Sequence, residues 1–213
     1  MMLGDRLMEL IGYGEDALTL WGLTHRLGDI INPFADKTPI DSCSVFFRPS
    51  FGRHGGPKSS EFGEFDFILI TNQAVYLGES KWHRSSEDLV DGKLHLRPEQ
   101  LERHEIMAWY IREWSEGAFK DWSDFFTKKG GKISKRNIVK PLPPPGSLLS
   151  ENLSKLLTEV QNRFGGQPLR IYNVLIYFHT GDEAQVLPKE SNGDFTIVNM
   201  DYSIDRLGNF IEL

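Results

Sequence analysis

Asp66, Glu79 and Lys81 are residues whose chemistry suits the binding of a hard cation and the activation of water. Two carboxylates a few ångströms apart can share a divalent cation such as Mg²⁺. A lysine beside them can orient a water molecule or take up its proton. Glu64 adds a third carboxylate, which would either reach the same cation or pair with Lys81. This chemistry requires that all four side chains point to the same place.

A β-hairpin would bring these side chains to one face of a sheet. The segments 63–70 and 74–82 read as strands, and the turn-like residues 71–73 separate them. With a two-residue loop, the register places Asp66 opposite Glu79, and side-chain alternation directs both to one face. Opposed Cβ atoms in such a pair lie about 5 Å apart. The other face of the first strand is expected to be apolar, with Phe65, Phe67 and Leu69.

The spacing of Asp66 and Glu79-x-Lys81 across a hairpin resembles the PD-(D/E)XK nuclease superfamily. The position before Asp66 is Phe65, where the family pattern has a proline that is often missing. The resemblance implies a restriction-endonuclease-like core, which runs helix, three strands, helix, strand around a mixed central sheet flanked by helices. It also implies a Mg²⁺ ion, replaceable by Mn²⁺, on Asp66, Glu79 and the Ser80 carbonyl, with Lys81 positioning the attacking water.

The remaining periodic segments follow the order of this α/β core. Pro98 stands at the first turn of a long helical segment, a position that proline favours. An apolar run at 169–178 is typical of a strand buried on both faces. We expect core strands near 42–49, 64–70, 74–82 and 169–178, core helices near 15–31 and 98–115, a further helix at 147–164 and a further strand at 194–200.

Two helical positions are further candidates for the catalytic site. In the superfamily, an acidic residue on the first helix and a polar residue on the second often point at the metal, and Glu15 and Gln100 match these positions. Glu15 also suits a helix N-terminus, where a carboxylate interacts favourably with the helix dipole, and both roles can hold together. His104 lies one turn after Gln100 on the same face, and we expect that face to be exposed.

The composition favours one domain over 1–213 with an ample hydrophobic core, since 39% of the 213 residues are hydrophobic. No run of about 18 apolar residues occurs, so no membrane span is expected. The first residues lack the apolar core of a signal peptide. The single Cys43 cannot form an internal disulfide or a cysteine-ligated zinc site, which suits the cytoplasm. Phosphate-loop and dinucleotide-binding motifs are absent.

Basic residues concentrate in a Pro- and Gly-punctuated insertion at 117–146, although the net charge is −6. Residues 128–132 contain three lysines and a glycine pair, and we expect a mobile loop that contacts a nucleic-acid backbone. The segment 48–58 is a second basic candidate. The predicted nucleic-acid contacts are Arg48, Arg53, Lys58, Lys128, Lys129, Lys132, Lys135 and Arg136.

The function that the resemblance implies is metal-dependent hydrolysis of phosphodiester bonds in nucleic acid, DNA more than RNA. One alternative is a catalytically inactive nucleic-acid-binding module that retains the nuclease fold. Another is an unrelated α/β protein in which the charges of the hairpin are ordinary exposed strand residues. The sequence leaves open endonuclease or exonuclease action, and it is compatible with a homodimer or a larger defence or repair complex.

Overall fold

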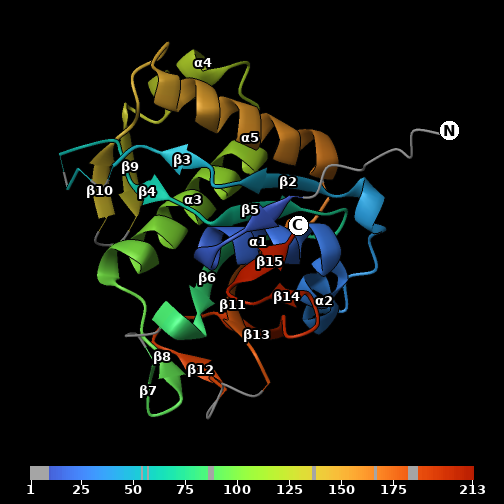
Figure 1. The fold of residues 1–213 in the computed structure, drawn as a ribbon. Helices are drawn as coiled ribbons and strands as arrows, with labels where there is room; N and C mark the ends of the chain where they lie inside the picture. The colour runs from blue at the N-terminus through green and yellow to red at the C-terminus, as the bar shows by residue number, and fades with distance from the viewer. Residues whose placement is uncertain are drawn as a thin grey trace, which may run out of the picture.

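The computed structural model describes residues 10–53, 55–56, 58–85, 89–135, 138–165, 167–181 and 187–213. Arg136, one of the predicted nucleic-acid contacts, lies outside these residues. A central five-stranded sheet with the order β13-β11-β6-β5-β2 is packed between helices (Figure 1). The sheet is mixed, because β11 is parallel to both β6 and β13 whereas β2, β5 and β6 are antiparallel neighbours. The predicted α/β class with a mixed central sheet is confirmed.

The strands of the central sheet lie close to their predicted positions. They are β2 (Ser44–Phe47), β5 (Phe67–Ile70), β6 (Val75–Trp82), β11 (Ile171–His179) and β13 (Thr196–Asp201). The first strand of the expected hairpin is shorter than predicted. Residues 63–64 instead form a separate strand, β4 (Gly63–Glu64), which pairs with β3 (Ser50–Phe51).

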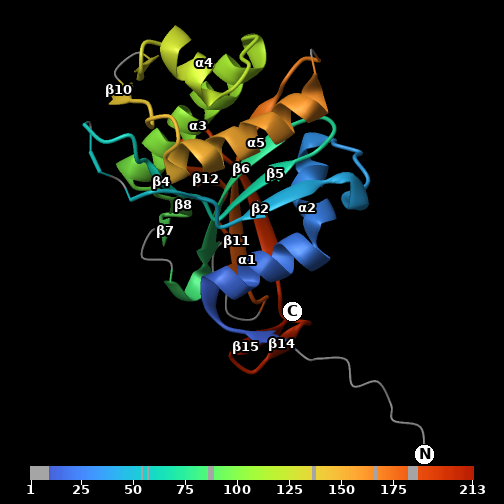
Figure 2. The same cartoon turned by 90° about the horizontal axis from the view of Figure 1, so that it is seen from above.

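Helices cover both faces of this sheet (Figure 2). The helix predicted at 15–31 is two helices, because Arg26 between them leaves helical geometry with φ −127° and ψ 23°. None of the described helices is both long and apolar enough to cross a membrane. The helices are α1 (Gly14–His25), α2 (Leu27–Ile31), α3 (Pro98–Glu116), α4 (Trp122–Lys128) and α5 (Leu148–Phe164).

The two faces of the hairpin strands pack into two different cores. Ile68 and Leu77 pack with α3 and α5, whereas Phe67 and Tyr76 pack with α1 and α2. Both faces of β5 are therefore buried, and its sequence reads as a continuous apolar run. The prediction that Phe65 shares a face with Phe67 is wrong, because Phe65 packs on the α3 side. The chain bends at residue 66, so the alternation of the strand is broken there.

Short strands and turns complete the structure. The strands are β1 (Ile11–Gly12), β14 (Arg206–Leu207) and β15 (Phe210–Glu212) in one small sheet, β7 (Leu89–Val90), β8 (Lys93–Leu94) and β12 (Glu190–Ser191) in another, and the hairpin β9 (Lys132–Lys135) and β10 (Ile138–Pro141). The 3₁₀ turns are η1 (Asn32–Phe34), η2 (Ile40–Ser42) and η3 (His83–Ser85).

The insertion at 117–146 has regular structure in its described part. It contains α4 and the antiparallel strands β9 and β10. The lysine-rich segment predicted as a mobile loop is the end of α4, a tight turn and the start of β9. Gly130 and Gly131 make this turn with φ values of +65° and +66°, a backbone conformation that favours glycine.

Candidate active site

The hairpin forms in the predicted register. β5 pairs with β6 from Phe67 opposite Gly78 to Ile70 opposite Val75, and the Thr71 N–H donates to the Ala74 carbonyl at 3.0 Å. Asp66 stands directly before the ladder, and β6 runs on to Trp82 without β5 beside it. Among the described residues, no strand therefore lies beside this edge of β6 from Glu79 onward.

Two carboxylates bind this open edge of β6. The Ser80 N–H donates to Oδ2 of Asp66 at 2.7 Å, and the Trp82 N–H donates to Oε2 of Glu15 at 2.9 Å. The N–H and C=O of one strand residue leave from the same edge, so the Ser80 carbonyl lies on this edge between the two amides. The structure thus brings Asp66, Glu15 and the Ser80 carbonyl together at this edge.

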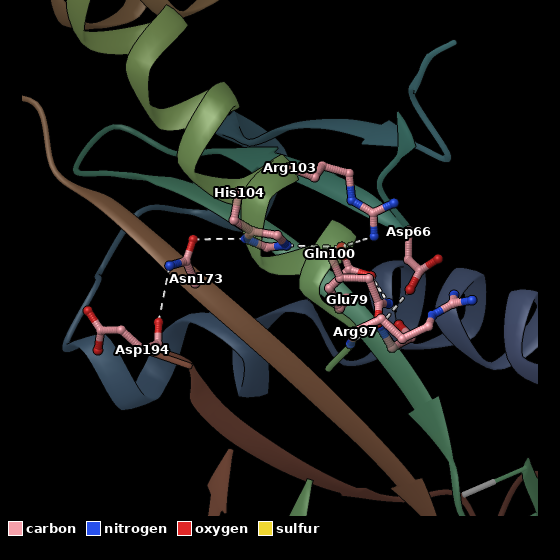
Figure 3. A network of polar contacts seen from close by, with 9 residues as sticks. Asp66, Glu79, Arg97, Gln100, Arg103, His104, Asn173 and Asp194 are labelled. Atoms are coloured by element: carbon pink, nitrogen blue, oxygen red, sulfur yellow. Dashed lines mark hydrogen bonds and ion pairs between the residues drawn. The ribbon is translucent and has the colours of Figure 1, made fainter. Parts of the chain in front are cut away.

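Glu79 is almost fully enclosed, with 1% of its surface exposed. Its Oε1 accepts from Arg103 at 2.5 Å and from Nε2 of His104 at 2.9 Å, and its Oε2 accepts from Nε2 of Gln100 at 3.1 Å (Figure 3). The Gln100 amide is oriented by the Arg97 N–H, which donates to its oxygen at 3.0 Å. Gln100 therefore lies beside Glu79 and binds it.

His104 is buried at 2% exposure, so the prediction that it lies on an exposed helical face is wrong. The Asn173 amide nitrogen donates to the Asp194 carbonyl at 3.1 Å, which leaves its oxygen to accept from Nδ1 of His104 at 2.8 Å. The other ring nitrogen faces the Glu79 carboxylate. His104 is therefore a buried hydrogen-bond partner of both Asn173 and Glu79.

The two neighbouring carboxylates respond in opposite ways to burial. Burial raises the pKa of Asp66 to about 7, and the negative charges of Glu79 and Glu15 add to this effect. Burial also acts to raise the pKa of Glu79, but the His104 hydrogen bond and the Arg103 charge outweigh it and the pKa is lowered. At neutral pH Glu79 is ionised, whereas Asp66 is about half protonated. Asp66 is therefore the group whose negative charge lacks compensation.

The sequence predicted one continuous strand pair that would place Glu64 opposite Lys81. The structure does not contain this continuous pair. Glu64 lies on β4, outside the β5–β6 ladder, and its carboxylate binds Arg48, which also binds Asp16. Lys81 is half-buried on β6, and side-chain alternation directs it to the face of Glu79.

The predicted nucleic-acid contacts fall into two groups. Arg53, Lys58 and Lys132 are exposed. Four others already have carboxylate partners in the structure, because Arg48 pairs as described above and three lysines of the insertion form further ion pairs. These are Lys128 with Asp124 at 2.9 Å, Lys129 with Glu113 and Lys135 with Glu105 at 3.6 Å.

Arg103 is a residue of the cluster that the sequence interpretation missed. It lies three positions after Gln100 and next to His104, so all three can reach the same side of α3. The sequence signal that could have identified Arg103 was the presence of glutamine, arginine and histidine on one face of a helix that follows the candidate acidic strand. All three side chains of α3 form hydrogen bonds with the Glu79 carboxylate.

The donor atoms suit a hard divalent cation, although the described residues contain no ready-made metal cluster of three His, Cys, Asp or Glu side chains. Oδ1 of Asp66 accepts no hydrogen bond from the described residues, and Oε2 of Glu79 accepts only one. The Ser80 carbonyl lies on the same edge as Asp66. Each of these oxygens has a lone pair available for a cation.

No family model, curated protein or solved structure matches this chain.

Proposed function

We propose that this chain is a divalent-metal-dependent nuclease that hydrolyses phosphodiester bonds, with DNA as a better substrate than RNA. The observation that carries the proposal is the open edge of β6, where Asp66 and Glu15 flank the Ser80 carbonyl beside Glu79. The order α1, β2-β5-β6, α3 and then β11 parallel to β6 supports a restriction-endonuclease-like core, since it repeats helix, three strands, helix, strand.

Mg²⁺ or Mn²⁺ would be held by Asp66, Glu79 and the Ser80 carbonyl. When bound, such a cation lowers the pKa of water and neutralises charge on a phosphate. The protein holds the ligands in place through the Ser80 amide on Asp66 and through α3 on Glu79. Lys81 would orient the attacking water and stabilise negative charge that develops on the phosphate.

The two basic segments are well placed to form one substrate-binding surface. Lys140 of β10 is buried, and its Nζ donates to the Gly56 carbonyl at 2.8 Å. This bond ties the β9–β10 hairpin to the loop after β3, and Figure 1 shows the hairpin beside β3 and β4. The exposed Arg53, Lys58 and Lys132 would contact the phosphate backbone.

A catalytically inactive nucleic-acid-binding module remains the second candidate. The observation that favours it is the enclosure of Glu79 by Arg103 and His104, which both bind its Oε1. A carboxylate that is permanently engaged in this way would be a poor metal ligand. The two candidates share the substrate and differ in whether the bound nucleic acid is cut.

Single-turnover cleavage of single-stranded DNA, duplex DNA and RNA, with Mg²⁺, Mn²⁺ or EDTA, tests the proposal. The parent should cut at least one substrate only with metal, and Asp66→Asn and Lys81→Ala should each lower the rate about 100-fold or more. Lys81→Ala should still bind Mn²⁺, because the lysine is not a ligand. Asp29→Asn, which removes an exposed ion pair with Arg26, is the matched control. Salt-dependent binding without any cleavage would establish the second candidate.

A further inference from the structure

The guanidinium of Arg103 is bonded to the protein through few of its donors. Of its five N–H groups, one on Nη2 donates to Glu79, and the buried Nε has no hydrogen-bond partner. A buried donor without a hydrogen-bond partner destabilises the arrangement that contains it. The Arg103 side chain is 12% exposed, so it is not fully enclosed. Such a group can bind an additional anion without first breaking many bonds.

The backbone near Asp66 is shaped around this arginine. The guanidinium carbon lies 5.2 Å from the ring centre of Phe65. Gly63 adopts φ +109°, and a Cβ placed there would lie 3.1 Å from Nη1. The positive charge of Arg103 acts to lower the pKa of both Asp66 and Glu79. The guanidinium therefore sits beside both carboxylates of the proposed metal site.

Glu79 does not depend on Arg103 for its hydrogen bonds. Gln100 and His104 would still donate to its two oxygens if the guanidinium moved away. The Arg103 bond is therefore the one that Glu79 can release while staying satisfied.

We propose that Arg103 is a catalytic residue that contacts the scissile phosphate, and that without metal it serves as a counter-ion on Glu79. This inference rests on the proposed nuclease function. A divalent cation and a guanidinium repel each other at one carboxylate, so cation binding favours release of Arg103. The released guanidinium can donate two parallel hydrogen bonds to phosphate oxygens, which a lysine cannot do.

Titration of the full chain with Mn²⁺ alone tests the counter-ion role. Arg103→Met keeps an apolar stem against Phe65 but removes the competing charge, and it should bind Mn²⁺ about tenfold more tightly than the parent. Arg103→Lys keeps the charge and should bind close to the parent value. Arg112→Met is the control, because Arg112 is exposed on the same helix. Unchanged or weaker Mn²⁺ binding by Arg103→Met would overturn this role. If Arg103→Met does not fold, Arg103→Gln takes its place.

Single-turnover cleavage with saturating enzyme and Mn²⁺ tests the phosphate contact. Arg103→Met and Arg103→Lys should each lose about 100-fold or more in rate, as expected when a preorganised donor to the reacting phosphate is removed. A parent-like rate for Arg103→Met would contradict the contact. If the parent cuts no substrate, the nuclease proposal fails separately. The affinity of Arg103→Met for DNA in Ca²⁺ then decides whether the arginine binds phosphate, with unchanged affinity counting against it.

Discussion

The β5–β6 hairpin has a partly or fully buried aspartate at each end, and the two are treated differently. At the closed end, Asp36 accepts from the Thr38 N–H at 2.8 Å, the Thr71 hydroxyl at 2.6 Å and the Tyr76 hydroxyl at 2.8 Å. At the open end, Asp66 accepts from the Ser80 N–H at 2.7 Å and from no other described residue. One carboxylate is saturated by hydrogen bonds, and the other is left with an available oxygen.

The two environments shift the two pKa values in opposite directions. Burial acts to raise the pKa of Asp36, but its hydrogen bonds outweigh burial and the pKa is lowered. Burial raises the pKa of Asp66 to about 7, and Glu79 adds a like charge beside it. A saturated carboxylate fixes a turn, whereas an under-bonded one beside a like charge is typical of a functional site. The comparison indicates that the closed end of the hairpin, at Asp36, stabilises the fold, whereas the open end, at Asp66, is the candidate functional site.

Glu79→Gln should give the largest loss of stability on this hairpin. The substitution leaves the Arg103 guanidinium without its carboxylate, and breaking a buried ion pair in this way typically costs about 3–5 kcal/mol. Urea denaturation at pH 7 with EDTA measures the free energy of unfolding. A loss below about 1 kcal/mol would show that the guanidinium readily finds another partner.

Asp36→Asn should be the next most damaging change, with a loss of about 2–3 kcal/mol. Asp36 accepts through both of its carboxylate oxygens, whereas an amide has only one acceptor oxygen, so at least one buried donor loses its partner. The same denaturation experiment applies, and Asp29→Asn at the surface should stay within about 0.5 kcal/mol of the parent. An equally small effect of Asp36→Asn would remove the contrast between the two ends of the hairpin.

Asp66→Asn should stabilise the metal-free chain, with a dependence on pH. Because folding raises the pKa of Asp66 from 3.8 to about 7, the parent loses stability as pH rises through this interval. The neutral amide avoids that loss, so the variant should gain stability relative to the parent progressively between pH 4 and pH 7. Asp36→Asn should show the opposite trend, because the lowered pKa of Asp36 gives the parent stability that disappears in acid. The free energy of unfolding is measured for each variant over this pH range. If Asp66→Asn shows no gain, Asp66 does not have a raised pKa.

Tyr76→Phe should have the smallest effect, about 1 kcal/mol, because it removes one of three hydrogen bonds to Asp36. The ring stays in its apolar core, and the two remaining donors still hold the carboxylate. Thermal unfolding of the parent and the variant measures the difference. A loss as large as that of Asp36→Asn would mean that the tyrosine hydroxyl alone organises the turn.

Much of the hairpin could be predicted from the sequence because it depends on local rules. Strand alternation and a two-residue loop were sufficient to place Phe67 opposite Gly78, and with them Asp66 beside the end of β6. The bend at residue 66 was not predictable in this way, since the pairing of Glu64 with Ser50 depends on a strand that follows β2.

The sequence by itself determined the order of elements, the register of the hairpin and the candidate carboxylates, because these follow from periodicity and turn residues along a continuous segment. Only the tertiary structure decided which carboxylate is compensated. Arg103 and His104 reach Glu79 from a helix more than 20 residues away in the chain, and Asp36 reaches Tyr76 across 40 residues. Charge compensation depends on distance in space, so it appears only once the helix has packed against the sheet.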